Sequence, residues 1–487
     1  MQTITLAMSV DDIIGKVQDA VWGWPLIILI LAAGVWLTVR TGFVQVRHLP
    51  RALRYMIKNE TGGEGEVTSF GALCTALSAT IGTGNIVGVA TAICLGGPGA
   101  LLWMLLAAFF GMATKYSEGF LAIKYREKKD DSHYLGGPFY YIEKGMGSKW
   151  KWLAKLFAVF GICVGLFGIG TFTQINGIAT AVQDFFDPES AHVAFTLFGN
   201  DYTWATVIGG LVVTLCVALV VLGGIQRIAK VSQVIVPFMA ITYVVFALII
   251  VLGHITAIPA AVKLICQSAF DPQAALGAAT GVTIKLAMQK GIGRGIFSNE
   301  AGLGSAPIAA AAAKTKDTVR QGLVTMTGTF IDTIVICTLT GLSIVVTGAQ
   351  NAFVAGSVEG VKITSRAWQT GLPWNGRFSA FVLMVCLAFF AFTTILGWNY
   401  YSERCLEYLV GSQKFTKVYR YLYILAVFIG PYLTVAAVWN IADICNGLMA
   451  FPNLIALFAL SGVVGKETRA YFAEKRHDLK AMAQDKK

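Results

Sequence analysis

The sequence predicts an all-α polytopic membrane protein with about eleven transmembrane helices. Hydrophobic residues make up 56% of the chain and charged residues only 13%, and the mean hydropathy is +0.66. These values exclude a soluble globular protein and a disordered one. A net charge of +11 would suggest a nucleic-acid partner for a soluble protein. Here the basic residues form blocks between apolar segments, as cytoplasmic loops do, so we expect no nucleic acid.

The first span covers residues 21–39 and sets the predicted orientation. Asp11 and Asp12 precede it, whereas a run of arginines that begins at Arg40 follows it. Because cytoplasmic loops carry the excess of basic residues, the span enters the membrane from outside and ends inside. Residues 1–20 are therefore expected to form an external N-terminus.

Two further segments are expected on the cytoplasmic side. Residues 49–57 carry their apolar side chains on one helical face, which predicts an amphipathic helix on the inner membrane surface. With the first span they form a leading unit, residues 21–66. Residues 466–487 form a basic tail that we expect to be cytoplasmic. The membrane is expected to be a plasma membrane, the inner membrane of a bacterium.

A glycine-rich stretch, residues 78–90, interrupts the second span, which runs over residues 70–95. Gly82 and Gly84 stand beside hydroxyl or amide residues and weaken the helix. In hydrocarbon a helix break is tolerated only where it is buried or lines a polar cavity. Its free N–H groups suit a carboxylate and its free C=O groups suit a cation. The alternative, a glycine contact between packed helices, stays open on this stretch alone.

The remaining spans follow from apolar runs. The third span, residues 101–120, returns inward and ends on charged residues that include Lys115 and Glu118. The loop over residues 183–202 contains acidic residues but no lysine or arginine, so it is expected to be external. Further spans are predicted over residues 156–182, 204–222, 231–252, 321–346, 378–400, 422–439 and 448–464.

One crossing is hidden from hydropathy. An external N-terminus and a cytoplasmic C-terminus require an odd number of crossings, and the clear spans number about ten. The missing crossing must lie within residues 271–314, where Lys285, Lys290 and Arg294 lower the hydropathy. This segment contains a second glycine-rich stretch, residues 291–305. Broken segments at corresponding places, here the second and seventh spans, indicate an inverted-repeat transporter.

Polar residues inside two other spans are candidates for function. The fourth span carries Gln174 and Asn176 beside several threonines. Such side chains serve either as contacts between helices or as substrate ligands. Asp332 lies in the middle of the eighth span, and an intramembrane carboxylate is a functional candidate by default. It binds a second cation, takes up a proton, or pairs with Arg294 or a lysine; these alternatives remain open.

Three motifs resemble the signatures of the alanine or glycine:cation symporter family. They are residues 82–92, residues 97–104 and residues 293–302, in the same order along the chain. The resemblance extends over residues 20–465. Leu102 departs from the second motif, where an aromatic residue is expected, and this affects only local packing.

The resemblance implies a fold and an activity. The fold is LeuT-type: one leading helix, then two five-helix inverted repeats, here residues 67–253 and residues 254–465. The activity is uptake of a small neutral amino acid, alanine or glycine, driven by sodium or protons. Sodium is the expected coupling ion, and no other cofactor is expected.

The resemblance also implies a sodium site at the first break. The carbonyl oxygens of Ser78 and Ile81 would bind the ion, and the hydroxyls of Thr393 and Thr394 on the ninth span would complete the site. The alternative is that both threonine hydroxyls bond to their own helix, as threonine often does in membranes.

The same resemblance places the substrate on the other side of the break. Its carboxylate would lie against the N–H groups of Thr83 and Gly84, beside Asn85, at the positive end of a half-helix. Aromatic caps on a small pocket suit alanine or glycine because added methylenes would clash. The remaining pocket walls implied by the resemblance are Gln174, Asn176, Phe297, Ser298 and Trp398.

Other functional classes fit the sequence less well. A channel needs a continuous polar lining, whereas polarity here is confined to patches within spans. A membrane enzyme needs catalytic or metal-binding groups at membrane depth, but the five histidines lie at loops or span ends and the cysteines lack metal-ligand spacing. We therefore expect a sodium-coupled symporter that works by alternating access. The alternatives are a proton-coupled symporter and a non-transporting amino-acid sensor.

Overall fold

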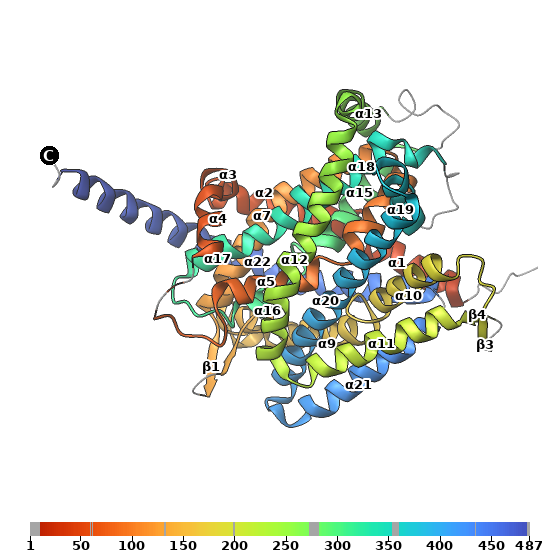
Figure 1. The fold of residues 1–487 in the computed structure, drawn as a ribbon. Coiled ribbons are helices and arrows are strands. Elements are labelled where there is room, and N and C mark those ends of the chain that lie inside the picture. Colours follow the sequence, from red (N-terminus) through yellow and green to blue (C-terminus); the bar gives the residue numbers. More distant parts are fainter. Residues whose placement is uncertain are drawn as a thin grey trace, which may run out of the picture.

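The structure is a computed structural model that describes residues 10–484 except 59, 61, 131–132, 198–199, 272–281, 353–359 and 434. The described residues form a helical bundle with two short antiparallel hairpins (Figure 1). Among the described residues, eight helices are long and apolar enough to cross a membrane, or up to nine if a bent pair counts as one span. The all-α membrane architecture is thus confirmed, whereas the number of eleven spans stays a prediction.

The first half of the chain contains the leading helices and the first broken helix. Its elements are α1 (Val10–Val21), α2 (Trp24–Arg40), α3 (Val44–Arg47), α4 (Leu49–Ile57), α5 (Ser69–Thr80), η1 (Gly84–Gly88), α6 (Val89–Gly96), α7 (Gly99–Lys124), β1 (Glu127–Asp130), β2 (His133–Leu135), α8 (Pro138–Tyr140), η2 (Tyr141–Gly145), η3 (Ser148–Trp150), α9 (Lys151–Phe167), α10 (Phe172–Phe186), β3 (Val193–Leu197), β4 (Asn200–Thr203), α11 (Trp204–Val221) and α12 (Gly224–Gly253).

The second half contains the second broken helix and the longest helices. Its elements are η4 (Ile255–Ala257), α13 (Ile258–Phe270), α15 (Ile284–Asn299), α16 (Ala306–Ala310), α17 (Thr318–Thr329), η6 (Phe330–Cys337), α18 (Thr338–Thr347), η7 (Ala349–Ala352), α19 (Gly360–Gly371), α20 (Gly376–Val410), η8 (Gln413–Phe415), α21 (Thr416–Ile429), η9 (Gly430–Tyr432) and α22 (Val435–Gln484).

Both glycine-rich stretches interrupt helices. α5 and α6 are bent by 52° relative to each other, and the helical segment between them, η1, begins only at Gly84. The second interruption separates α15 from α16. There Glu300 takes a left-handed backbone with φ of 56°, and Gly302 and Gly304 have φ of 92° and 83°. Two glycines thus supply the backbone conformations that a side chain rarely adopts.

Two predicted spans differ from the structure. The fourth predicted span lies within one candidate membrane span, Ser148–Phe186, but the helix is interrupted: α9 ends at Phe167 and α10 begins at Phe172, with Gly168 and Gly170 between them. Glycine weakens a helix interior, so the chain turns here. The tenth span was expected to reach residue 439, but α21 ends at Ile429, just before Pro431. Proline disfavours helical backbone in the residue before it and cannot donate a helical hydrogen bond.

The elements predicted to be external and cytoplasmic lie at opposite ends of the bundle. In Figure 1, α1 and the β3–β4 hairpin lie at one end, on the right. α3, α4, the β1 strand and the C-terminal part of α22 lie at the other end, on the left. The predicted amphipathic segment is a helix, α4, and it packs against α5 and α17.

Candidate functional site

The first break is held by side chains from its own and a neighbouring helix. The N–H of Gly82 donates to Oδ1 of Asn85 at 2.9 Å, and the N–H of Thr83 donates to Oε1 of Gln174 at 3.2 Å. Gly82 has no room for a side chain, since a Cβ there would lie 2.5 Å from Oγ1 of Thr394. A glycine is therefore required where α10 and α20 meet the break.

The carbonyl side of the break faces the ninth predicted span. Oγ1 of Thr394 lies 3.3 Å from the carbonyl oxygen of Ile81 and 3.0 Å from that of Phe390 in its own helix. Thr393 also donates to the Phe390 carbonyl, at 3.0 Å. Ser78 donates from its hydroxyl to the preceding turn, and all four predicted ion ligands are buried. Both threonine hydroxyls thus bond within their own helix, and that of Thr394 also faces the break; their role as ion ligands stays a prediction.

Asp332 connects the first break to the helix before the second break. Its carboxylate accepts hydrogen bonds from Nδ2 of Asn85 at 2.7 Å, from Oγ of Ser298 at 2.9 Å and from Oγ1 of Thr333 at 2.7 Å. It lies in the π-helical segment η6 and is fully buried. Arg294 does not pair with it in the structure; its guanidinium lies 3.9 Å from Asp443 instead. Three uncharged donors therefore surround the carboxylate.

The second break is bonded by Glu118 and Asn453, which the sequence analysis did not single out for function, and by Trp398, which it predicted as a pocket wall. The N–H of Gly302 donates to Oε1 of Glu118 at 3.2 Å. Nδ2 of Asn453 donates both to Glu118, at 2.7 Å, and to the carbonyl of Gly302, at 2.8 Å. Glu300 accepts from Nε1 of Trp398 at 2.9 Å. The N–H and the carbonyl of Gly302 in the second break thus both have side-chain partners.

Two of the missed residues lie in the third predicted span. Lys115 and Glu118 were taken as its charged inner end, but in the structure they are 2% and 0% exposed within α7. The available signal was their spacing, which places both on one face of a helix that continues to Lys124.

A cavity of about 640 Å³ extends from the first break. It is lined by Thr83 and Gly84 at the break, by Asn176 on α10 and by Phe297 on α15. Its other walls include residues 183, 184, 188 and 190, from the end of α10 and the loop that the sequence predicts to be external. The structure thus brings four of the predicted substrate residues to one cavity. Asn85, Gln174, Ser298 and Trp398 are not among its lining residues.

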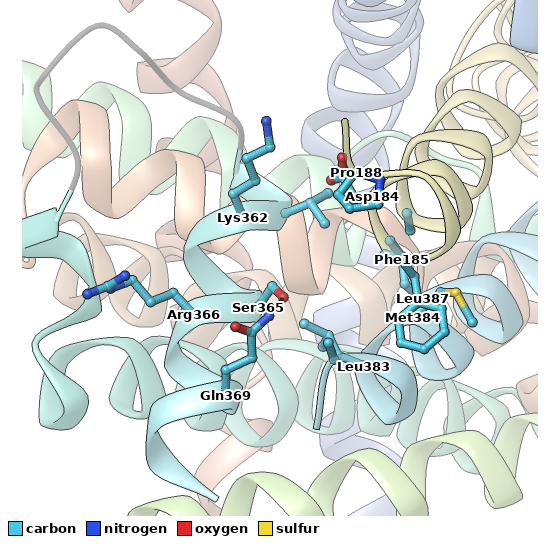
Figure 2. A pocket seen from close by; sticks show the side chains of 13 residues that line it. Asp184, Phe185, Pro188, Lys362, Ser365, Arg366, Gln369, Leu383, Met384 and Leu387 are labelled. Atoms are coloured by element: carbon cyan, nitrogen blue, oxygen red, sulfur yellow. Dashed lines mark hydrogen bonds between the residues drawn. The ribbon is translucent and has the colours of Figure 1, made fainter. Parts of the chain in front are cut away.

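A smaller pocket of about 300 Å³ adjoins this cavity (Figure 2). The two share Asp184, Pro188, Val361 and Lys362, so together they form one vestibule between α10, α19 and α20. In Figure 2 the side chain of Lys362 points out of the pocket, and Leu383, Met384 and Leu387 of α20 form an apolar wall. The vestibule connects the broken helix to the end of the bundle that carries α1 and β3–β4.

The opposite end is held together by a cluster of charged residues, which we call the latch: Glu66, His133, Arg404 and Glu407. His133 contacts Glu66 at 3.2 Å and Glu407 at 2.7 Å, and Arg404 contacts Glu407 at 2.6 Å. Burial disfavours the charged imidazole, but the hydrogen bonds to the two carboxylates outweigh this and raise the pKa of His133 to about 9. The latch joins the segment before α5, the β2 strand and α20.

Comparison with known proteins supports the fold and the family. The family model "Sodium:alanine symporter family" matches residues 7–486. The chain is 45% identical to the sodium/alanine symporter AgcS of Methanococcus maripaludis, over 97% of this chain and 100% of that protein. It is 37% identical to the putative sodium/proton-dependent alanine carrier protein YrbD of Bacillus subtilis, over 96% of this chain and 94% of that protein.

A solved structure shows the same architecture. The crystal structure of MhsT in complex with L-phenylalanine matches with a TM-score of 0.56 at 12% identity, covering 84% of this chain and 99% of that chain. At this identity the likeness concerns the fold alone, which is LeuT-type. The family model covers nearly the whole chain, and the family is one of membrane transporters rather than enzymes. The chain therefore belongs to the sodium:alanine symporter family.

Proposed function

We propose that the protein couples the inward movement of sodium to the uptake of alanine or glycine by alternating access. The observation that carries the proposal is the break between α5 and α6. Its N–H end lines the large cavity, and the carbonyl of Ile81 at its other end faces Thr394 at 3.3 Å. Ion and substrate would then share one broken helix, so the binding of each strengthens the binding of the other.

We place the sodium ion on the carbonyl side of the break. Its oxygen ligands are the carbonyls of Ser78 and Ile81 and the hydroxyls of Thr393 and Thr394. All four residues are buried, so the ion would lose its hydration shell and need several protein oxygens in return. The short approach of Thr394 to Ile81 supports a site between α5 and α20.

We place the substrate carboxylate at the start of η1, where a half-helix dipole favours negative charge. Of the two predicted N–H donors, Thr83 already donates to Gln174 at 3.2 Å, so Gly84 is left to bind the carboxylate. Asn176 and Phe297 supply cavity walls. Asn85 and Ser298 act from behind the cavity through Asp332. Gln174 and Trp398 are the two remaining residues that we predict to form the substrate site. In the structure Trp398 contacts Glu300 at the second break rather than the cavity. 

The role of Gln174 can be tested by substitution. Its amide oxygen accepts from the Thr83 N–H, so Gln174→Ala removes a buried partner and should weaken alanine binding by about 1–3 kcal/mol. Gln174→Glu should weaken binding further, because it adds a negative charge next to the break that repels the substrate carboxylate. Binding of labelled alanine to purified protein measures both effects. Unchanged affinity in a well-folded Gln174→Ala variant would remove Gln174 from the site.

The proposed activity is tested by reconstitution. Purified protein in proteoliposomes should accumulate labelled alanine when sodium is imposed outside, and unlabelled glycine should compete. Without a sodium gradient the accumulation should stop. Binding of alanine with no uptake under any gradient would instead identify a sensor.

Proton coupling is the second candidate, and the surroundings of Asp332 favour it. The carboxylate is buried among uncharged donors, which makes it a group that a proton could neutralise. The name of the relative YrbD, putative sodium/proton-dependent alanine carrier protein, includes both ions. Uptake that follows a pH gradient without sodium, and that is lost in Asp332→Asn, would favour this candidate over sodium.

We also propose that the N-terminus lies outside and the C-terminal tail in the cytoplasm of a bacterial inner membrane. Figure 1 supports this, because α1 and the end of α22 lie at opposite ends of the bundle. In a background without native cysteines, a cysteine replacing Gln2 should react with an impermeant external reagent and a cysteine replacing Ala483 should not. If the cysteine at position 483 reacts and the one at position 2 does not, the proposed topology is wrong.

A further inference from the structure

Lys115 lies between the ends of the two broken helices. It is 2% exposed, and within the described residues its Nζ has no hydrogen-bond partner. It lines a cavity of about 10 Å³, which is about the space of a single water. Thr80, the last residue of α5, and Asn299, the last residue of α15, line the same cavity. The lysine is therefore next to the carbonyl end of each helix that precedes a break.

The surroundings of Lys115 carry negative charge. The carbonyl end of a helix bears a partial negative charge, and two such ends meet here. Three carboxylates, each 0% exposed, belong to the elements around this cavity. Glu118 lies one turn further along α7, Glu300 follows Asn299, and Asp332 accepts a hydrogen bond from Ser298. Buried carboxylates without a compensating positive charge are costly. The three carboxylates therefore need compensation, either by a nearby positive charge or by bound protons.

The hydrogen bonds around these carboxylates come from uncharged groups. Glu118 accepts from Asn453 and from a backbone N–H, and Glu300 accepts from Trp398 and Ser305. Asp332 is likewise held by amide and hydroxyl donors. In the described part of the chain no carboxylate lies within 4.0 Å of Lys115 as an ion pair. The ammonium thus acts on the cluster as a whole rather than as the partner of one acid.

We propose that Lys115 is a built-in cation that sets how many external cations the transporter takes up with each amino acid. It is a positioning residue that acts through the buried carboxylates and touches neither substrate nor ion. The ammonium of Lys115 permanently compensates one unit of the negative charge of the cluster, and it opposes a second cation near the breaks. Without it, the same carboxylates require one more cation in every cycle. This inference rests on the proposed sodium coupling.

The test compares transport by the wild-type protein and Lys115→Met in proteoliposomes. The measurements are the charge moved per alanine, from reversal potentials, and the sodium concentration for half-maximal uptake. In Lys115→Met the charge moved per alanine should rise by one. The half-maximal sodium concentration should fall about tenfold, since a positive charge no longer opposes the ion at the neighbouring Thr80–Ile81 segment. Lys124→Met, which removes a more exposed lysine of the same helix, should change neither quantity.

A compensating variant separates this role from a structural one. Lys115→Met combined with Glu118→Gln removes one charge of each sign, so the wild-type charge ratio and sodium dependence should return. If Lys115→Met alone does not fold, the charge ratio and the sodium dependence are measured on the double variant instead. An unchanged charge ratio and sodium dependence in Lys115→Met, or failure of the folded double variant to restore them, would overturn the inference. Wild-type uptake without any sodium dependence would refute the proposed coupling instead.

Discussion

Replacing Thr393 and Thr394 together by alanine should raise the sodium concentration needed for half-maximal transport by about tenfold to a hundredfold. Hydrogen bonds and ion contacts of a charged partner are worth about 1.5–3 kcal/mol, and each 1.4 kcal/mol is about tenfold in affinity. Both hydroxyls are buried beside the first break, where water cannot replace them. Transport should therefore be poor at low sodium and partly restored at high sodium.

The single variants make this prediction sharper. Thr394 faces the carbonyl of Ile81, whereas the hydroxyl of Thr393 lies 3.5 Å from Sδ of Met239. Thr394→Ala should therefore produce most of the effect, and Thr394→Ser should keep near-normal sodium dependence because it retains the hydroxyl. Since ion and substrate share the break, weaker sodium binding must also lower the apparent alanine affinity at low sodium. A double variant with normal sodium dependence would place the ion elsewhere.

The first break was predictable because its cause is local. Gly82 and Gly84 weaken the helix whatever surrounds them, so the interruption can be predicted from neighbouring residues in the sequence. The second break was expected within residues 291–305, and the structure narrows it to the segment after Asn299. The left-handed backbone of Glu300 was not predicted, and its carboxylate bonds both to Ser305 in the same break and to Trp398 on a distant helix.

The buried charges near the second break were not predicted, because their burial depends on contacts between distant parts of the chain. Lys115 and Glu118 look like the charged end of a span, because a membrane protein places most charges at its surfaces. Their burial follows from the packing of α7 against α15 and α17, which depends on contacts far apart in the sequence. Asp332 was found because a single carboxylate in an apolar run is conspicuous, but its partners Asn85 and Ser298 come from two other helices.

The latch should hold one end of the transport path closed, on the side that we propose to be cytoplasmic. The vestibule reaches the break from the other end, so the structure corresponds to an outward-facing state in that orientation. His133 bridges Glu66 and Glu407, and opening this end requires the segment before α5 to separate from α20. His133→Gln removes the positive charge from the bridge. The open fraction should therefore rise about tenfold or more, the worth of one charge-assisted hydrogen bond.

The same bridge predicts how opening depends on pH. The pKa of His133 is raised from its ordinary value of 6.5 to about 9, so its stabilising effect on the closed state is complete below pH 6.5 and is lost as the pH rises through 9. Glu66, Glu407 and Arg404 face the imidazole directly. The pocket beside it is also lined by further groups that titrate or carry charge: Glu127, Lys129, Tyr140, Glu143, Lys144, Lys151 and Tyr408.

A buried reporter measures the opening. Val67 is 9% exposed beside the latch, so a cysteine placed there in a background without native cysteines should react only when this end opens. Lys149 is exposed, so a cysteine placed there serves as the reference. Dividing the reaction rate at position 67 by the rate at position 149 corrects for the pH dependence of the thiol itself. This ratio should rise between pH 8 and 10 in the wild-type latch and should be high and independent of pH in His133→Gln. His192→Gln, in the loop before β3, should behave like the wild type. A wild-type ratio that stays constant through pH 9 would show that the imidazole does not hold this end closed, because the loss of its charge would then leave the opening equilibrium unchanged.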